Sequence, residues 1–181
     1  MIFSKPLFYI RKVKDHSLNK KKLLDIMSGV NQPYRNTDNP NPYSYISNTD
    51  WNLSQVGWNW FEAGFSERDK KSYFKFLNRK FKATDFRLGK TWFNQYSKRS
   101  GSEHGFHNHE GSNQLTNIYY LELKDKSLRT ILKHPETDKD IIPRVHEGDL
   151  LTFDSLIFHK SPPNFTDNRK TIISFNTSCV K

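Results

Sequence analysis

The spacing of apolar positions changes near residue 86. Before this point, residues 66–83 carry an apolar stripe at intervals of three and four residues behind a Ser66 N-cap, which predicts a helix. Nearer the start, residues 5–13 alternate as a strand does, and residues 17–27 have helical spacing, with Ser17 as the expected cap. The first half is therefore expected to be largely helical.

After this point the apolar residues recur with a period of two, which is typical of strands separated by turns. The predicted strands are residues 86–97, 113–123, 127–134, 141–153 and 169–178. Short strands without intervening helices favour a sandwich or a barrel. In contrast, residues 31–50 are rich in Asn, Pro, Ser and Asp and predict a long loop, of the kind that often borders a site.

A length of 181 residues favours a single domain over 1–181. Within it, we expect residues 1–85 to supply supporting helices, a strand and a loop, and residues 86–181 to form the β core. No apolar run is long enough for a transmembrane helix, and charges interrupt the N-terminal apolar stretch, so we expect neither a membrane partner nor a secretory signal. The single cysteine, Cys179, excludes an intramolecular disulfide and a cysteine zinc site and favours a cytoplasmic protein.

The formal net charge of +10 admits two interpretations. The simpler is a lysine-rich solvated surface. The other is a nucleic-acid partner, for which the aromatic residues Trp51, Trp58, Trp60 and Phe61 could stack on bases instead of packing in the core.

The segment "HGFHNHEGS" (104–112) is the clearest sign of chemistry. If its centre is a strand, His107 and His109 point to the same side and can bind one metal ion. A third ligand must come from elsewhere, and His159 follows a predicted strand. Ten residues further on, Arg169 and Thr171 share one face of the last predicted strand, where a guanidinium and a hydroxyl could bind a carboxylate.

These elements together resemble the 2-oxoglutarate- and Fe(II)-dependent dioxygenases. Within them, the chain is similar to small predicted oxygenases of marine bacteria and phages, and the likeness extends over nearly the whole chain. The matching segments are "TWFNQYS", "HNH", "NIYYLEL", "GDLLTF", "FHKSPPN" and "RKTIISFN".

The resemblance implies a mainly β (α+β) fold, a double-stranded β-helix or jelly roll with N-terminal supporting helices. It implies Fe(II) as the metal, with O2 and 2-oxoglutarate as co-substrates. The far carboxylate of 2-oxoglutarate would pair with Arg169 and Thr171. The implied activity is hydroxylation of a protein side chain, a peptide or a small molecule, coupled to oxidative decarboxylation of 2-oxoglutarate to succinate.

The iron ligands depart from the usual pattern of two histidines and one carboxylate. Three alternatives stay open: a triad of His107, His109 and His159, a displaced carboxylate from Glu110 or Asp154, or a pair formed by His104 and His107. The first is favoured because the His-x-His pair recurs in the resembling group and faces one side of a strand. The third ranks lower because His104 precedes Gly105, which indicates a loop.

Two further pocket residues are expected. Tyr119 shares a strand face with Leu121 and Leu123, so its hydroxyl could reach the co-substrate, and Asn94 could contact substrate or 2-oxoglutarate. Either could instead be a plain packing residue. Two alternative functions also remain: a nucleic-acid-modifying oxygenase, and a non-catalytic, cupin-like or phage structural metal-binding jelly roll. The primary substrate is not readable from the sequence.

Overall fold

The structure is a computed structural model that describes residues 6–36, 44–53, 59–111 and 114–181. Trp58 and residues 37–43 of the predicted loop lie outside the described residues. Residues 31–50 do not form one continuous loop, because their described part contains three short strands: β2 (Tyr34–Asn36), β3 (Ser44–Ile46) and β4 (Asn48–Thr49).

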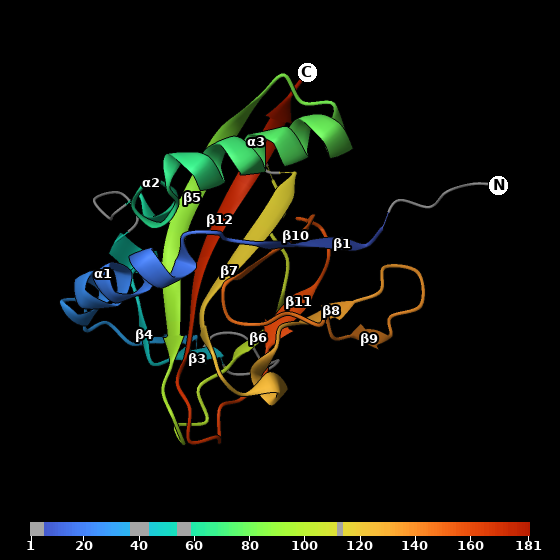
Figure 1. Cartoon of the computed structure of the whole chain (residues 1–181). Helices are drawn as coiled ribbons and strands as arrows, with labels where there is room; N and C mark the ends of the chain where they lie inside the picture. The colour runs from blue at the N-terminus through green and yellow to red at the C-terminus, as the bar shows by residue number, and fades with distance from the viewer. Residues whose placement is uncertain (1–5, 37–43, 54–58, 112–113) are drawn as a thin grey trace.

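A large antiparallel sheet runs through the molecule (Figure 1). Its strands, in spatial order, are β1 (Phe8–Lys12), β10 (Asp149–Asp154), β7 (Leu115–Leu123), β12 (Lys170–Val180), β5 (Asp85–Tyr96) and β4. The first 85 residues therefore add two strands, β1 and β4, to the sheet, in addition to the helices expected there.

A smaller sheet lies against one face of the large one. It contains β6 (His104–His107), β11 (His159–Ser161), β8 (Ile131–Lys133) and β9 (Asp140–Ile141), in that order. The β2–β3 hairpin is joined to its edge by an antiparallel bridge between Tyr45 and Glu103. The two facing antiparallel sheets and few helices agree with the predicted mainly β fold.

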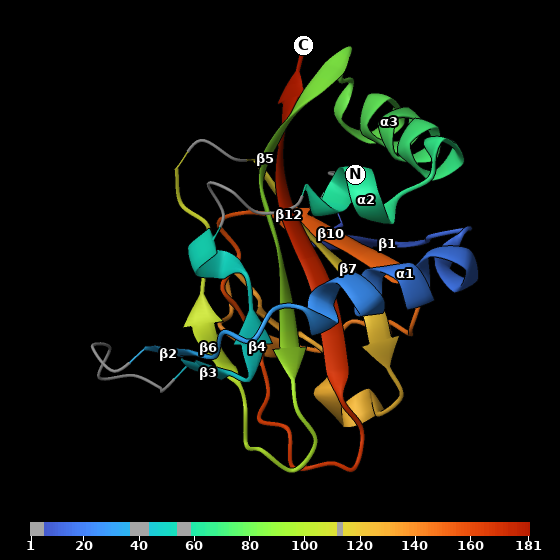
Figure 2. The same cartoon turned by 90° about the vertical axis from the view of Figure 1, so that its left-hand side faces the viewer.

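Three helices cover the other face of the large sheet: α1 (His16–Ser28), α2 (Trp60–Gly64) and α3 (Glu67–Phe81). Figure 2 shows them on the opposite side of the large sheet from β6 and the β2–β3 hairpin. Short 3-10 helices, η1 (Trp51–Leu53) and η2 (Lys126–Leu128), lie in the connections. In the described part of the chain, no helix has the length and apolar character needed to cross a membrane.

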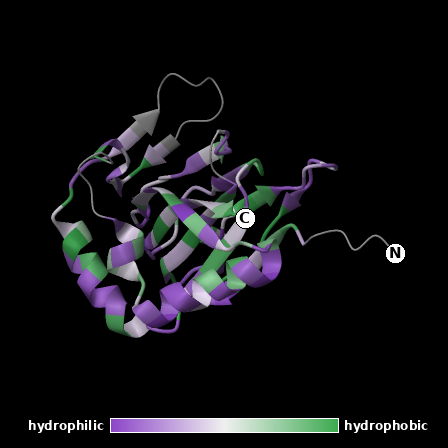
Figure 3. Ribbon diagram, turned by 90° about the horizontal axis from the view of Figure 1, so that it is seen from above, coloured by the Kyte–Doolittle hydropathy of each residue, from purple (hydrophilic) through white to green (hydrophobic). Residues whose placement is uncertain are grey.

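The caps of two helices test the predictions of where they begin. The Ser66 cap is confirmed, since its side chain accepts a hydrogen bond from the backbone N–H of Asp69 at 3.2 Å. In contrast, α1 starts after Asp15, which makes no side-chain capping bond, and the predicted cap Ser17 lies inside the helix. Hydrophobic and hydrophilic residues alternate along the helical ribbons, as expected for helices with one buried face (Figure 3).

Strand alternation divides the core into two layers. The outer layer packs the helices against Phe93, Tyr119 and Ile173 of the large sheet. The inner layer lies between the two sheets and includes Tyr120 and Ile172. Consecutive residues of one strand thus face either the helices or the space between the sheets, and only the second face can contribute to a site there.

A bulge in β7 interrupts this alternation. Thr171 pairs with Glu122, but the next residue of β12 pairs with Tyr120, so one residue of β7 is extra. Leu121 belongs to the outer layer, the Glu122 side chain also points outward to Thr171, and Leu123 returns to the inner layer. Tyr119 and Leu121 therefore share a face, but the prediction that Leu123 shares it too is wrong.

Candidate metal centre and co-substrate cavity

Three histidines converge between the two sheets. His107 ends β6 and pairs directly with His159, the first residue of β11. His109 lies just beyond β6, where its backbone N–H donates to the carbonyl of Ser155 at 2.8 Å. One imidazole nitrogen from each residue lies within 4.8 Å of the other two. Among the described residues, these three histidines form the group that could hold a metal ion. His109 lies beyond the end of β6, in a segment without regular secondary structure, and still comes to the same side as His107.

Backbone carbonyls orient two of these imidazoles. The Nδ1 atom of His107 lies 2.8 Å from the carbonyl oxygen of Gly105, and Nδ1 of His159 lies 3.1 Å from that of Ile157. A carbonyl only accepts, so Nδ1 carries the proton in both rings and Nε2 keeps a free lone pair. This arrangement is the usual support for histidines that bind metals.

Burial keeps the imidazoles neutral. Desolvation, and then the nearby His107, lower the pKa of His109 to about 4. Desolvation also lowers the pKa of His107, and it lowers the pKa of His159 well below its ordinary value. All three imidazoles are therefore neutral at neutral pH, each with one ring nitrogen free of a proton, and this is the form that binds a metal.

His104 is a fourth, partly buried histidine beside this group. It opens β6 instead of lying in the expected loop, and β6 has a bulge, because His104 pairs with Ser161 while His107 pairs with His159. Two steps along β11 therefore correspond to three steps along β6. The extra residue brings His104 and His107 to the same, inward face. Their rings stack with centroids 3.8 Å apart. His104 supports His107 from the side without joining the group of three.

Neither alternative carboxylate reaches the histidines. Glu110 is exposed and accepts a hydrogen bond from the side-chain amide of Asn108 at 3.2 Å. Asp154 is also exposed, and its carboxylate accepts from the backbone N–H of Leu156 at 2.9 Å. The structure therefore gives no support to a displaced carboxylate ligand from these two residues.

An inner cavity adjoins the histidines between the sheets. It is lined by Trp92, Asn94, Tyr96, His104, His107, His109, Ile118, Thr130, His159, Lys160, Ser161, Ile172 and Ser174. No described lining residue is acidic. Lys160 is the one cationic residue among them, and its ammonium group lies over the ring of Phe106, 4.5 Å from the centroid.

A second cation, Lys170, adjoins the inner end of this cavity. Its side chain is fully buried, and its Nζ donates to the hydroxyl of Ser161 at 2.8 Å. The same nitrogen lies 5.1 Å from the ring centroid of Tyr96 and 6.0 Å from that of Tyr120. Burial lowers the pKa of Lys170 to about 7, and no carboxylate of the described residues is close enough to raise it. A buried ammonium without a counter-charge is a ready partner for an anion.

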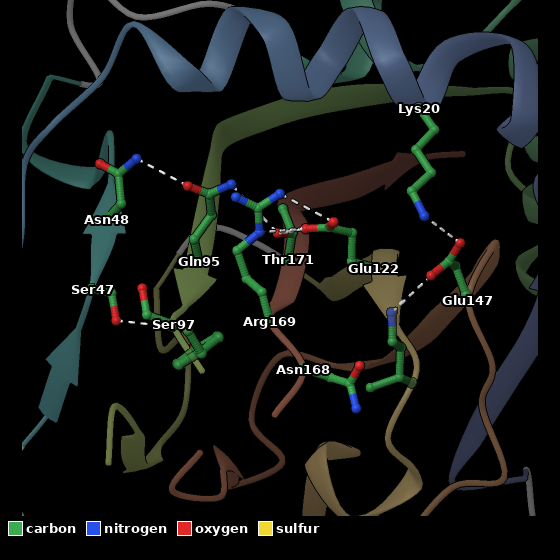
Figure 4. Close-up of polar contacts among 12 residues, drawn as sticks. Lys20, Ser47, Asn48, Gln95, Ser97, Glu122, Glu147, Asn168, Arg169 and Thr171 are labelled. Carbon is green, nitrogen blue, oxygen red and sulfur yellow. Dashed lines mark hydrogen bonds and ion pairs between the residues drawn. The ribbon is translucent and has the colours of Figure 1, made fainter. Parts of the chain in front are cut away.

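The structure does not bring Arg169 or Thr171 to the histidines. Figure 4 shows them on the helix side of the large sheet, together with Glu122. Arg169 Nε and Nη2 donate to the two oxygens of Glu122 at 2.8 and 3.1 Å, and Thr171 donates to the same carboxylate. Adjacent residues of a strand point to opposite faces, so the inward residue of this pair of cations is Lys170. The placement expected for Arg169 and Thr171 is corrected accordingly.

Tyr119 also lies on the outer face. It packs in the outer core layer, and its hydroxyl lies 2.7 Å from Nδ1 of His16, so it does not line the cavity. Asn94, in contrast, faces the cavity as expected, and its Oδ1 accepts a hydrogen bond from Thr49 at 2.8 Å. The side chain of Asn94 also hydrogen-bonds with the hydroxyl of Tyr96, another residue of the cavity wall.

A mouth cavity of about 230 Å³ leads from the surface to the histidines. It shares Trp92, Asn94, His104, His107 and His109 with the inner cavity, and adds Tyr34, Ile46, Trp51 and Asn108. The rings of Trp51 and Trp92 meet edge to face at 4.6 Å. No described residue lining it is charged. The entrance is therefore aromatic and neutral.

Ser161 in the cavity wall and Lys170 beside it were not predicted from the sequence. The signal for Lys170 was present, because strand alternation joins it to Ile172 and Ser174, while Arg169 falls on the other face. Ser161, two residues after His159, carried no signal of its own.

Comparison with known proteins gives no match to a family model and no match among curated proteins. Solved structures do match. A 2OG-Fe(II) oxygenase family oxidoreductase from Burkholderia pseudomallei superposes with a TM-score of 0.66 at 12% identity, over 95% of this chain and 85% of that one. A prolyl hydroxylase from Trichoplax adhaerens, in complex with a hypoxia inducible factor peptide fragment, has a TM-score of 0.63 at 18% identity, over 94% and 83%.

A third similar structure is that of an enzyme with another reaction outcome. The non-heme alpha ketoglutarate dependent epimerase SnoN from nogalamycin biosynthesis gives a TM-score of 0.68 at 10% identity, over 96% of this chain and 78% of that one. Identities this low support the fold alone. The chain therefore has the double-stranded β-helix fold of the 2OG-Fe(II) oxygenases.

Proposed function

We propose that the protein is an Fe(II)- and 2-oxoglutarate-dependent dioxygenase. The observations that carry this proposal are three neutral, converging imidazoles around one cavity and, beside that cavity, a buried ammonium group without a carboxylate partner among the described residues. The first can hold a divalent metal, and the second can hold a distal carboxylate. The fold is one that 2OG-Fe(II) oxygenases have, which supports this chemistry but does not by itself establish the activity.

The donor set fits a divalent metal ion. His107, His109 and His159 would each supply one nitrogen, and three protein ligands leave further positions free for co-substrates. An iron ion bound there supplies oxygen activation coupled to decarboxylation of 2-oxoglutarate to succinate. The replacement of the usual carboxylate by His109 leaves the metal with three neutral ligands, which strengthens its attraction for an anionic co-substrate.

The polar groups at the inner end of this cavity suit the second end of 2-oxoglutarate. Lys170 would donate to its distal carboxylate, and Ser161, already bonded to Lys170, holds the ammonium group in place. Asn94, whose side chain is held by Thr49 and Tyr96, would contact the co-substrate from the wall of the same cavity. We thus assign to Lys170 the role that the sequence resemblance gave to Arg169, while Thr171 and Tyr119 stay outside the co-substrate site.

The chain's own contribution is orientation and exclusion of water. Carbonyls of Gly105 and Ile157 hold two imidazoles, and the inner core layer surrounds the cavity with buried aromatic rings. In such a dry site, the attraction between Lys170 and a carboxylate is stronger than in water. Binding and aligning the co-substrate therefore lie within the reach of the residues present.

The mouth cavity is the route for the primary substrate. Its neutral, aromatic wall favours an uncharged group on a protein side chain, a peptide or a small molecule. The similar structures include a peptide-bound prolyl hydroxylase and an epimerase, so hydroxylation is our proposal among outcomes that this fold accommodates.

A nucleic-acid substrate of the same chemistry is the second candidate. The charge of +10 favours it. However, Trp60 and Phe61 are buried in the outer core layer, which leaves Trp51 as the described member of that aromatic group at the mouth. A non-catalytic, cupin-like or phage structural protein is the third candidate, and the unpaired cation Lys170 argues against it because a simple metal site does not require one.

One assay separates these candidates. The protein with Fe(II), ascorbate and oxygen is incubated with 2-oxoglutarate, and succinate is measured with and without peptide, small-molecule and oligonucleotide panels. We expect slow succinate formation without primary substrate and faster formation with the correct class. The Lys170→Met variant should lose this turnover. Absence of any succinate from the metal-loaded wild-type protein would contradict the proposal.

A further inference from the structure

The strand register places Glu122 near Lys170, but the Glu122 carboxylate lies on the opposite face of the sheet. It lies opposite Thr171, the residue next to Lys170, in the register of β7 and β12. Normal alternation along β7 would point Glu122 to the same face as Tyr120, that is, toward the inner layer and Lys170. The bulge at Leu121 and Glu122 reverses this direction.

Two side chains that flank Lys170 fix Glu122 on the outer face. Arg169 donates two hydrogen bonds to its carboxylate, and Thr171 donates a third. We call Arg169, Thr171 and Glu122 the clasp. Because Lys170 lies between Arg169 and Thr171, the two residues bonded to Glu122 fix the backbone on either side of the buried lysine.

The clasp continues as a polar row across the sheet. Gln95 on β5 donates to the Thr171 hydroxyl at 3.4 Å, and Asn48 on β4 donates to Gln95 Oε1 at 3.0 Å (Figure 4). The row therefore crosses four strands, β4, β5, β12 and β7, at the level where β12 begins. These side-chain hydrogen bonds tie the first residues of β12 to the neighbouring strands.

We propose that the clasp is a positioning device for the co-substrate site: it withdraws the Glu122 carboxylate from the cavity and fixes the start of β12, so that Lys170 remains free to bind the distal carboxylate of a dicarboxylic 2-oxo acid. This inference rests on the proposed function, since it assigns Lys170 to that carboxylate. A clasp residue touches neither metal nor co-substrate and acts through Lys170 alone.

Two observations favour this explanation over simple surface stabilisation. Thr171 is fully buried, and the Glu122 side chain is only 18% exposed, so their contacts are shielded from solvent. In addition, an inward-pointing Glu122 would give Lys170 a permanent internal ion pair, and an ammonium already paired has little to gain from a ligand carboxylate. The outward direction of Glu122 is thus a condition for anion binding.

The test compares two 2-oxo acids that differ in one carboxylate. 2-Oxoglutarate and 2-oxopentanoate have the same chain length and the same metal-binding end, but the second lacks the distal carboxylate. Both are titrated by calorimetry into Mn(II)-loaded wild-type protein and into the variants Thr171→Val and Glu122→Gln. The control is Lys20→Met, which removes the Lys20–Glu147 ion pair on the same side of the sheet.

We expect both clasp variants to bind 2-oxoglutarate about ten times more weakly, as for other residues that orient a binding group. Their affinity for 2-oxopentanoate should stay at the wild-type value, and Lys20→Met should match the wild type with both acids. In a Lys170→Met background, Glu122→Gln should cause no further loss, because the clasp acts through that lysine.

Two results would overturn the inference: wild-type affinity for 2-oxoglutarate in both clasp variants, or an equal loss for both acids, which indicates general damage to the site. Thr171→Val, which conserves shape, guards against a folding failure of Glu122→Gln. Failure of the wild-type protein itself to bind 2-oxoglutarate would instead contradict the proposed function.

Discussion

Arg169 and Lys170 are adjacent in the chain, yet their side chains lie on opposite faces of the large sheet. Arg169 donates to Glu122 under the helices, whereas Lys170 donates to Ser161 between the two sheets. The exposed guanidinium therefore has a carboxylate partner, whereas the buried ammonium has none in the part of the chain that the structure describes. We therefore assign a structural role to Arg169 and an anion-binding role to Lys170.

Burial of Lys170 should make stability depend on pH. Its pKa is about 7 in the folded protein, below the ordinary value of 10.5, so between these values the unfolded state binds more protons and the free energy of unfolding rises with pH. The slope should be about 1.4 kcal/mol per pH unit. Urea unfolding at pH 7 and pH 9 measures it.

Lys170→Met supplies the comparison for this slope. The variant should be more stable than the wild type at pH 7, because it buries no charge, and the advantage should shrink toward pH 9. Tyr96 and Tyr120, which face Lys170, do not interfere, since burial raises the pKa of both phenols. A difference in stability that stays constant with pH would contradict the assignment.

Substitution of single histidines should separate ligands from neighbours. His107→Ala and His159→Ala should each weaken Co(II) or Mn(II) binding at least tenfold, because the remaining pair cannot enclose the ion. His104→Phe should retain a stoichiometry of one metal, since His104 stacks on His107 without joining the group of three. Metal content after dialysis gives the answer. If His104→Phe loses its metal while His109→Ala keeps it, the ligand assignment is wrong.

The mouth cavity should affect the primary substrate more than the co-substrate. Trp51 lines the mouth but not the inner cavity. Trp51→Ala should therefore leave the KM for 2-oxoglutarate unchanged in the reaction without primary substrate, and should abolish the stimulation by a primary substrate once one is found. A several-fold rise in the KM for 2-oxoglutarate would place Trp51 in the co-substrate site instead.

A buried amide joins α3 to the large sheet. Asn117 Oδ1 accepts from the hydroxyls of Tyr73 at 3.0 Å and Thr152 at 2.8 Å, and its amide nitrogen donates to Thr177 at 3.2 Å. Asn117→Leu leaves these hydroxyls buried without their partner, so urea unfolding should show a loss of about 2–4 kcal/mol. Tyr73→Phe should cost about 1 kcal/mol. Equal stability of Asn117→Leu and wild type would show that the amide contributes little.

Sequence periodicity was sufficient for the long strands and helices, because alternation and capping are local. It did not predict α2 or the short strands β2, β3 and β4, and the single strand predicted over residues 141–153 is wrong, because β9 and β10 are separate strands there. It predicted β5, β7, β12 and α3 close to their observed bounds. It also found the three converging histidines and the cavity position of Asn94. What it could not supply was the face on which a strand's side chains lie.

Bulges explain two of the errors. A bulge in β6 lets His104 and His107 face inward together, and a bulge in β7 turns Glu122 outward. One extra residue reverses every side chain beyond it, and no local pattern marks its position. The choice of Arg169 over Lys170 has another cause: both are cations, and only their pairing with Glu122 and Ser161 separates them.

The most direct test of the account is calorimetric titration of 2-oxoglutarate into the Mn(II)-loaded wild-type protein and into Lys170→Met. We predict one binding site in the wild type and a loss of affinity of at least tenfold in the variant, with 2-oxopentanoate binding equally to both. Absence of 2-oxoglutarate binding to the metal-loaded wild type, or equal affinity for it in the two proteins, would contradict the account.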